Sequence, residues 1–110
     1  MEINNFNKEE AKKAHGGSIL AADIISDKMN PPFGHAWGYL EDGGEMETDL
    51  HPAAEIYIIV KGQGQVKIEG ETSEVEAGDV IEIPPDNNHS ISCKENQELL
   101  WAAFWWDKKD

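Results

Sequence analysis

The sequence contains no arginine, and its nine lysines stand against 22 aspartate and glutamate residues, which gives a formal net charge of -13. An acidic surface repels phosphate backbones and anionic lipids, so neither nucleic acid nor a membrane is expected as a partner. Without a guanidinium group the protein cannot form the bidentate clamp that usually fixes carboxylate or phosphate ligands. A strongly anionic ligand would therefore have to bind through a metal or a lysine.

Cysteine and long apolar runs are also scarce. The single cysteine, Cys93, excludes an internal disulfide and a cysteine-based zinc site. No apolar run approaches the roughly 20 residues of a membrane helix, and residues 1–10 lack the basic start and apolar stretch of a secretory signal. These absences predict a cytoplasmic protein, and its 110 residues suffice for one compact domain but not for two.

Residues 1–35 are expected to form an N-terminal arm on that domain. The stretch 8–15 (KEEAKKAH) predicts a short helix, with Asn7 as its N-cap and His15 complementing its negative end. A glycine pair then stops the helix. Residues 18–26 predict a β segment that pairs at a sheet edge or crosses to a second subunit.

Residues 36–110 show short strands separated by turn residues, which predicts the main barrel. Glycine-containing breaks such as Asp42-Gly43-Gly44 supply the positive φ angles of tight turns between antiparallel strands. The expected strands are 36–41, 45–50, 55–61, 64–69, 73–76, 80–84, 90–94 and 98–106. Many short strands with one short helix predict an all-β fold, a small antiparallel β-barrel or jelly roll (double-stranded β-helix).

Two histidines occupy positions from which strand geometry can bring them together. Because side chains alternate faces along a strand, Asp49, His51 and Glu55 share one face if the strand direction continues past Pro52. His89 begins another strand. Two imidazoles and one carboxylate form a set that leaves coordination positions open for water, oxygen or a chelating substrate. If Asp49 also binds, two nitrogens and two oxygens suit manganese, iron or zinc better than copper(I).

Two motifs carry a family resemblance over roughly residues 36–106. The first reads Gly-x5-Asp-x-His-x3-Glu-x6-Gly at Gly43, Asp49, His51, Glu55 and Gly62, and it resembles the first cupin motif, Gly-x5-His-x-His-x3,4-Glu-x6-Gly. The second reads Gly-x5-Pro-x-Asp-x2-His at Gly78, Pro84, Asp86 and His89, and it is similar to the second cupin motif, Gly-x5-Pro-x-Gly-x2-His-x3-Asn. Two motifs in the right order are far more specific than either alone.

The resemblance implies a cupin barrel with a metal ion in its mouth. By position, His51, Glu55 and His89 match three of the family's four usual ligands, and the implied cofactor is one divalent ion, iron, manganese, zinc or nickel. Charge favours the ion too. Two carboxylates meeting in a closed interior would cost several kcal/mol unless a cation or a proton lay between them.

Three residues depart from the family pattern. Asp49 stands in place of the first histidine, which allows an altered metal preference, a three-residue site or loss of the metal. Asp86 replaces a glycine but tolerates turn conformations better than most residues do. Cys93 replaces the final asparagine and shares parity with His89, so it either faces the cavity or, on the general habit of buried thiols, packs inertly.

Other side chains are candidates for lining the pocket or an interface. Tyr57 follows Glu55 on the same face and is the candidate catalytic residue, able to orient a substrate or act as an acid; packing is the alternative. His35 and Trp37 are placed at the rim of the barrel mouth. The strand 98–106 is apolar on both faces, which predicts a core face plus a subunit interface, hence a homodimer, with a tryptophan-lined ligand pocket as the alternative.

Two function classes follow from this site. The first is a metal-dependent enzyme that chelates a small organic substrate and supports dioxygenation or isomerisation. The second is a non-catalytic cupin that binds or senses a small molecule, favoured by Asp49 and by the lack of an evident second acid or base. A structural barrel without metal is a third possibility. The sequence leaves these open because one fold hosts many chemistries.

Overall fold

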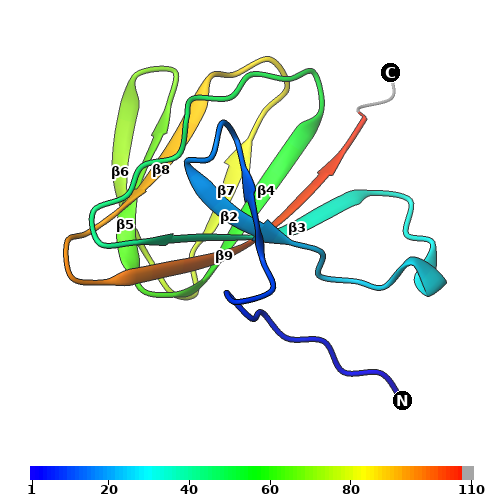
Figure 1. Cartoon of the computed structure of the whole chain (residues 1–110). Helices are drawn as coiled ribbons and strands as arrows, with labels where there is room; N and C mark the ends of the chain where they lie inside the picture. The colour runs from blue at the N-terminus through cyan, green and yellow to red at the C-terminus, as the bar shows by residue number, and fades with distance from the viewer. Residues whose placement is uncertain (108–110) are drawn as a thin grey trace.

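The strands of the computed structural model, which describes residues 1–107, form two antiparallel sheets (Figure 1). The larger sheet has the strand order β1 (Lys12–Ala14), β2 (Ile19–Ala22), β3 (Gly34–Glu41), β9 (Glu98–Trp106), β4 (Ala54–Lys61) and β7 (Val80–Ile83). The smaller sheet has the order β6 (Glu71–Glu76), β5 (Gln63–Ile68) and β8 (His89–Cys93). The predicted all-β, antiparallel architecture is confirmed.

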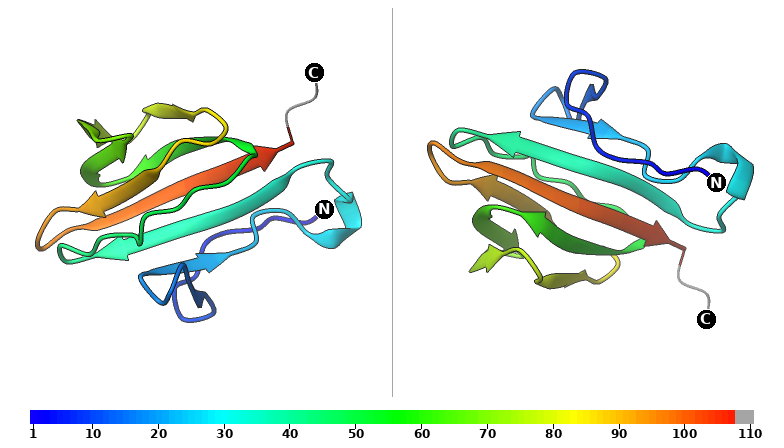
Figure 2. Two further views of the ribbon diagram at one scale, coloured as in Figure 1. Left: turned by 90° about the horizontal axis from the view of Figure 1, so that it is seen from above. Right: turned by 90° about the horizontal axis from the view of Figure 1, so that it is seen from below.

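Strand β9 lies at the centre of the larger sheet. It pairs with β3 from Gly34↔Trp105 to Glu41↔Glu98 and with β4 on its other side. Figure 2 shows β3 and β9 side by side along their length, with the N-terminal hairpin on one flank and β4 on the other. A strand paired on both edges still has one face toward the interior and one away from it. On β9 the inward residues Leu99, Trp101 and Ala103 are buried, while Leu100 and Phe104 on the other face are partly exposed.

The core fills the space between the two sheets. Along β4, Glu55, Tyr57 and Ile59 are buried while their neighbours are more exposed, as expected for alternating side chains. Trp101 and Leu99 of β9 are no more than 1% exposed. The interior therefore carries one carboxylate among apolar side chains, and that exception marks the site described below.

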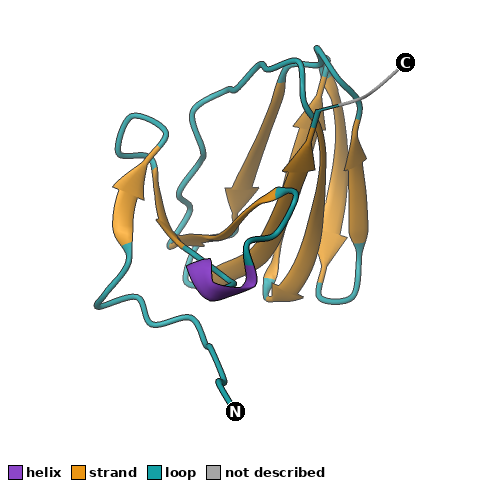
Figure 3. Ribbon diagram, turned by 90° about the vertical axis from the view of Figure 1, so that its right-hand side faces the viewer, coloured by secondary structure: helices purple, strands orange, loops and turns teal. Residues whose placement is uncertain are grey.

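The predicted helix over residues 8–15 is wrong. Asn7 Oδ1 does accept the backbone N–H of Glu9, at 3.0 Å, but only a turn follows, and Lys12–Ala14 forms β1 against β2. An isolated eight-residue helix is too short to be stable alone, whereas the strand gains a partner that local periodicity cannot reveal. Among residues 1–107 the helical content is one short turn, η1 (Asp27–Met29) (Figure 3), and no helix there could cross a membrane.

The predicted strand over residues 45–50 does not form as a continuous strand. This segment makes only isolated bridges to β8, Glu45↔Ser92 and Asp49↔His89. The backbone N–H of Met46 donates to the Ile91 carbonyl at 2.8 Å between them. The segment thus runs beside β8 without forming a continuous ladder, and it still brings Asp49 next to His89.

Candidate metal centre

Three of the four residues predicted as ligands, Asp49, His51 and His89, form one cluster, and the fourth, Glu55, contacts both histidines. Glu55 Oε1 lies 3.0 Å from His51 Nε2 and 3.3 Å from His89 Nε2. Asp49 Oδ2 lies 3.9 Å from His51 Nε2. One ligand atom each from Asp49, His51 and His89 all lie within 4.8 Å of one another. Residues from the loop before β4, from β4 itself and from β8 therefore converge.

Backbone contacts hold these residues in place. Asp49 and His89 exchange two backbone hydrogen bonds, of 2.9 Å and 3.0 Å. The backbone N–H of Asp86 donates to the His51 carbonyl at 2.9 Å, which joins the turn before β8 to the loop before β4. Asp86 adopts a φ of 61°, in the left-handed region that its short polar side chain tolerates. The two motifs are thus tied to each other directly.

Each imidazole is oriented by a backbone carbonyl. His51 Nδ1 lies 2.9 Å from the Ala53 carbonyl, and His89 Nδ1 lies 2.9 Å from the Asn87 carbonyl. A carbonyl only accepts, so Nδ1 carries the proton in both rings, and in the neutral ring Nε2 presents a lone pair. Both Nε2 atoms face the carboxylate of Glu55. This is how histidine ligands are commonly held toward a metal.

Without a cation this arrangement brings lone pairs and carboxylates together. His89 is 1% exposed, and its Nε2 has no hydrogen-bond partner of acceptable geometry among the described residues. Burial lowers the pKa of His89, but the nearby Glu55 carboxylate, the Asn87 carbonyl and the charge of Asp49 outweigh it, so the pKa lies above its usual value. A positive charge is therefore favoured at this point, and a proton or a metal ion can supply it.

The spacing of the donor atoms suits one small divalent ion. Ligands about 2.1 Å from a shared ion, at tetrahedral or octahedral angles, lie about 3.0–3.4 Å from one another. The separations of 3.0 Å, 3.3 Å and 3.9 Å among Glu55, His51, His89 and Asp49 are close to that range. Imidazole nitrogen with carboxylate oxygen is a donor set for manganese, iron, nickel or zinc. The residues present therefore fit the ion.

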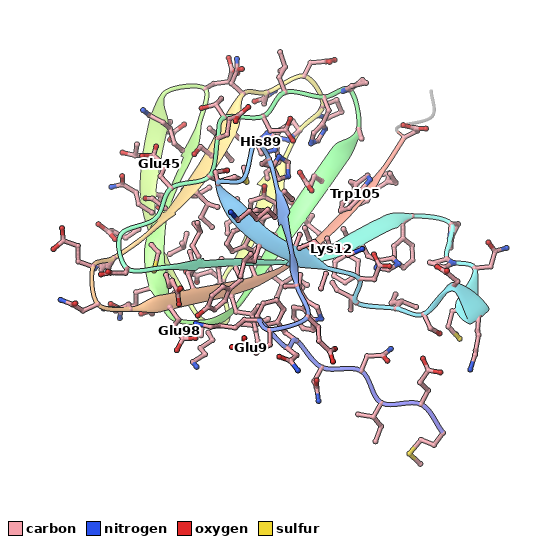
Figure 4. The ribbon with its side chains drawn as sticks, viewed as in Figure 1. Glu9, Lys12, Glu45, His89, Glu98 and Trp105 are labelled. Carbon is pink, nitrogen blue, oxygen red and sulfur yellow. The ribbon has the colours of Figure 1, made fainter. Side chains whose placement is uncertain are left out.

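A small cavity of about 60 Å³ opens beside the cluster. Its walls include Glu55, Tyr57, Trp101, Trp105 and His15. A water molecule needs roughly 10–15 Å³ on this measure, so the space holds only a few non-hydrogen atoms. In Figure 4, His89 lies toward the upper end of the molecule among side chains of several strands.

Two glycines of β3 make room for the tryptophans of this cavity. A Cβ on Gly38 would come within 2.2 Å of the Trp101 indole, and a Cβ on Gly34 within 2.0 Å of the Trp105 indole. Both indoles therefore pack directly on the β3 backbone. Any side chain at Gly38 or Gly34 would displace an indole and alter the cavity wall.

Tyr57 lies in the interior and is 3% exposed. It lines the cavity, as the sequence predicted for a pocket residue. Its hydroxyl has a weak acceptor, Met46 Sδ at 3.7 Å. Burial, with the charges of Glu55 and Asp49, raises the pKa of Tyr57 well above its usual value. The phenol therefore stays protonated, and a bound molecule in the cavity would compete only with this weak sulfur acceptor for its proton.

Three further candidates from the sequence, His35, Trp37 and Cys93, are not part of the donor cluster. His35 Nδ1 accepts the backbone N–H groups of Ile24, at 3.1 Å, and Ile25, at 3.4 Å, so it anchors a loop. Trp37 borders the cavity and meets Phe6 edge-on. Cys93 is buried in the core cluster, and its thiol lies 3.3 Å from each of two backbone carbonyls, so it packs as an ordinary buried thiol.

Sequence reasoning missed one residue of this site, His15. Its Nδ1 lies 3.7 Å from Asp49 Oδ2, and the residue borders the cavity. The sequence placed it at a helix end. Since no helix forms, the turn between β1 and β2 carries His15 to the barrel instead. Nothing in the spacing of the two motifs points to a residue so far upstream.

A larger groove of about 640 Å³ lies elsewhere, along β5, β6 and β7. Val66, Val75 and Ile81 border it, together with Glu71 and Glu82. None of the four candidate ligands contributes to its wall. Size alone therefore does not identify the functional site, and the donor cluster does.

Comparison with known proteins agrees with the motifs. The family model of the cupin domain (Cupin_2) matches residues 37–106. The chain belongs to the cupin family. No curated protein matches this cupin. Solved structures do match it, and they share its fold.

Three of these solved structures illustrate the similarity. A cupin 2 conserved barrel domain protein from Salinispora arenicola is 24% identical, with a TM-score of 0.86 over 97% of this chain and 89% of its own. A protein from Photorhabdus luminescens is 23% identical, with a TM-score of 0.86 over 96% and 88%. A predicted oxalate decarboxylase from Thermotoga maritima is 26% identical, with a TM-score of 0.73 over 82% and 81%. The first two span the N-terminal hairpin as well as the barrel.

Proposed function

We propose that this cupin is a metal-dependent enzyme acting on a small, oxygen-bearing organic molecule. One divalent ion is held by His51, Glu55 and His89, with Asp49 as a further oxygen ligand. The observation that carries the proposal is the meeting of two oriented Nε2 atoms with two carboxylates in and beside a closed interior. Such an ion binds and polarises substrate oxygen atoms, which supports dioxygenation or isomerisation.

The protein's own groups define what the substrate meets. Tyr57 offers a protonated hydroxyl from the floor of the cavity, and the indoles of Trp101 and Trp105 form apolar walls. These groups orient a small molecule and keep bulk water away from the reacting atoms. The cavity of about 60 Å³ favours a substrate of a few non-hydrogen atoms.

The similarity to the predicted oxalate decarboxylase supports the same substrate class. Oxalate is a small dicarboxylate that chelates a metal through two oxygens. A chain without arginine has no guanidinium clamp for such an anion, so the ion itself provides the attraction. Oxalate is therefore the first substrate to test, followed by other small acids with adjacent oxygen atoms.

Turnover measured with and without the cluster tests the proposal. Protein loaded with Mn²⁺ or Fe²⁺ is incubated with a panel of small 1,2-oxygenated acids, oxalate included, and products are followed by carbon-13 NMR and oxygen uptake. We expect turnover that disappears in His51→Ala and persists in His35→Ala, a histidine outside the cluster. Tight, saturable binding of panel members without turnover would favour the second candidate, a sensing cupin.

The sensing alternative is favoured by one observation. The hydroxyl of Tyr57 already contacts the sulfur of Met46, and the two acidic groups of the cluster, Glu55 and Asp49, are assigned to the ion. Few groups are therefore left to move protons during a reaction. A bound ligand would then be held by the metal and reported through the hairpin that carries His15.

We further propose a homodimer formed through the outer face of the larger sheet. This outer apolar face contains Ile56, Ile58, Val80, Leu100, Phe104 and Trp106. Val80 is 58% exposed and Trp106 is 42% exposed in the single chain. Monomeric proteins rarely leave contiguous apolar patches larger than a few hundred Å² in water, and a second copy covers such a face with matching residues.

A further inference from the structure

The carboxylate of Asp49 lies between two imidazoles. Its Oδ2 is 3.9 Å from His51 Nε2 and 3.7 Å from His15 Nδ1. Its second oxygen, Oδ1, accepts the backbone N–H of Leu50 at 2.9 Å. The described residues thus offer Oδ2 two nitrogen neighbours, and His15 is the one that no cupin motif includes.

The turn between β1 and β2 directs His15 at the cluster. His15 has a φ of 51°, in the left-handed region that costs energy for residues other than glycine. Its carbonyl accepts the hydroxyl of Ser18 at 2.6 Å, and that hydroxyl accepts the backbone N–H of Glu47 at 2.8 Å. The strained turn is therefore tied to the segment that carries Asp49, and strain of this kind often marks functional positions.

His15 does not have the position of a ligand itself. The set of donor atoms that lie within 4.8 Å of one another contains Asp49, His51 and His89, and His15 is outside it. Its Nδ1 lies 3.7 Å from Asp49 Oδ2, within ion-pair distance but longer than a hydrogen bond, in the place of a second polar group that orients a metal ligand. It also lines the cavity that Glu55 borders.

We propose that His15 is a positioning residue that orients Asp49 toward the metal and so compensates for the histidine that the first motif lacks. A histidine ligand offers one lone pair at a single ring nitrogen, whereas an aspartate carboxylate offers two oxygens with several lone pairs. A polar neighbour at Oδ2 restricts which of these directions the carboxylate presents to the ion. The inference rests on the proposed metal site and assigns to it a residue outside the 37–106 region that matches the family model.

Metal affinity measured in three variants tests the inference. His15→Gly removes the imidazole without adding strain at a positive φ, whereas His15→Asn keeps a donor near the position of Nδ1 and tolerates the same φ. The dissociation constant for Mn²⁺ is measured by calorimetry on chelator-treated full-length protein. We expect His15→Gly to weaken binding about 10-fold and His15→Asn to restore most of it. Asn30→Gly, at another positive φ in η1's cap, is the matched control and leaves affinity unchanged.

A second background separates positioning from general stability. In Asp49→Asn protein, whose metal affinity is already reduced, we expect His15→Gly to have no further effect. An equal loss in both backgrounds, or no loss in either, overturns the inference while leaving the metal site in place. A wild-type protein that binds no Mn²⁺, Fe²⁺, Ni²⁺ or Zn²⁺ overturns the proposed function and this inference with it.

Discussion

Asp49 and His89 are joined by a pair of backbone hydrogen bonds, so the residue that departs from the first cupin motif is fixed beside the histidine of the second. The backbone, and not the identity of the side chain, brings position 49 to the cluster. Replacing the histidine of the motif by aspartate therefore changes the ligand chemistry and keeps the geometry. This relationship gives the first prediction.

Asp49→His should restore the motif and shift metal preference. Three imidazoles with one carboxylate form a softer donor set than two imidazoles with two carboxylates, so nickel and zinc gain relative to manganese. We expect the ratio of Ni²⁺ to Mn²⁺ affinity to rise about 10-fold or more in competition experiments. Asp49→Asn serves as the control for loss of charge. An unchanged ratio in Asp49→His would show that position 49 does not bind the ion.

Tyr57→Phe should separate catalysis from folding. The hydroxyl meets only the sulfur of Met46 among described residues, at 3.7 Å, so its removal should change the free energy of unfolding by less than about 1 kcal/mol. Metal affinity should also be unchanged, because the phenol is not among the donor atoms. Turnover or ligand affinity should fall at least about 10-fold if the hydroxyl orients the substrate. Full activity in this variant would show that Tyr57 only packs in the core.

Val80→Lys should dissociate the proposed homodimer. Val80 is 58% exposed in the single chain, so lysine there costs the monomer little but places a charge in the outer apolar face. Light scattering after size-exclusion chromatography should give the mass of two chains for wild type and of one chain for the variant. Thr72→Lys, an equivalent change on the exposed edge strand β6, should remain dimeric. A wild-type mass of one chain would refute the dimer.

Cys93 should resist thiol reagents in the folded protein. Burial raises the pKa of its thiol, so the reactive thiolate is scarce at pH 8, and the side chain is 6% exposed. We expect negligible labelling by a disulfide exchange reagent until denaturant is added, when one thiol per chain should react. Rapid labelling of the native protein would contradict the assignment of Cys93 to the core.

The sequence predicted that Asp49, His51 and His89 come together, and they do, because the two motifs that contain them are local. The expected strand does not continue back past Pro52, because β4 begins at Ala54 and His51 lies in the loop before it. Four residues of spacing still bring His51 to Glu55, with Nε2 3.0 Å from Oε1, and the turn around Asp86 sets the position of His89. The sequence also predicted the strands β4 and β9. Apolar residues alternate along β4, and β9 is a nearly continuous apolar run. Asp86 adopts the left-handed conformation that its substitution for glycine predicted.

The N-terminal region was misread because its structure depends on distant partners. Lys12–Ala14 has helix-forming residues but is too short to be helical alone, and pairing with β2 decides its conformation. His15 then follows the hairpin, not a helix axis. His15 and Asp49 are 34 residues apart in the sequence, and the periodicity of a sequence predicts only local structure. It therefore could not predict this contact.

Anomalous diffraction at a metal absorption edge, from crystals of protein purified without added metals and then loaded with Mn²⁺ or Zn²⁺, tests the central claim most directly. The account predicts one strong peak per chain, about 2.0–2.3 Å from Nε2 of His51 and of His89 and from a carboxylate oxygen of Glu55. A chain with no peak in this cluster, or with the ion bound elsewhere on its acidic surface, would contradict it.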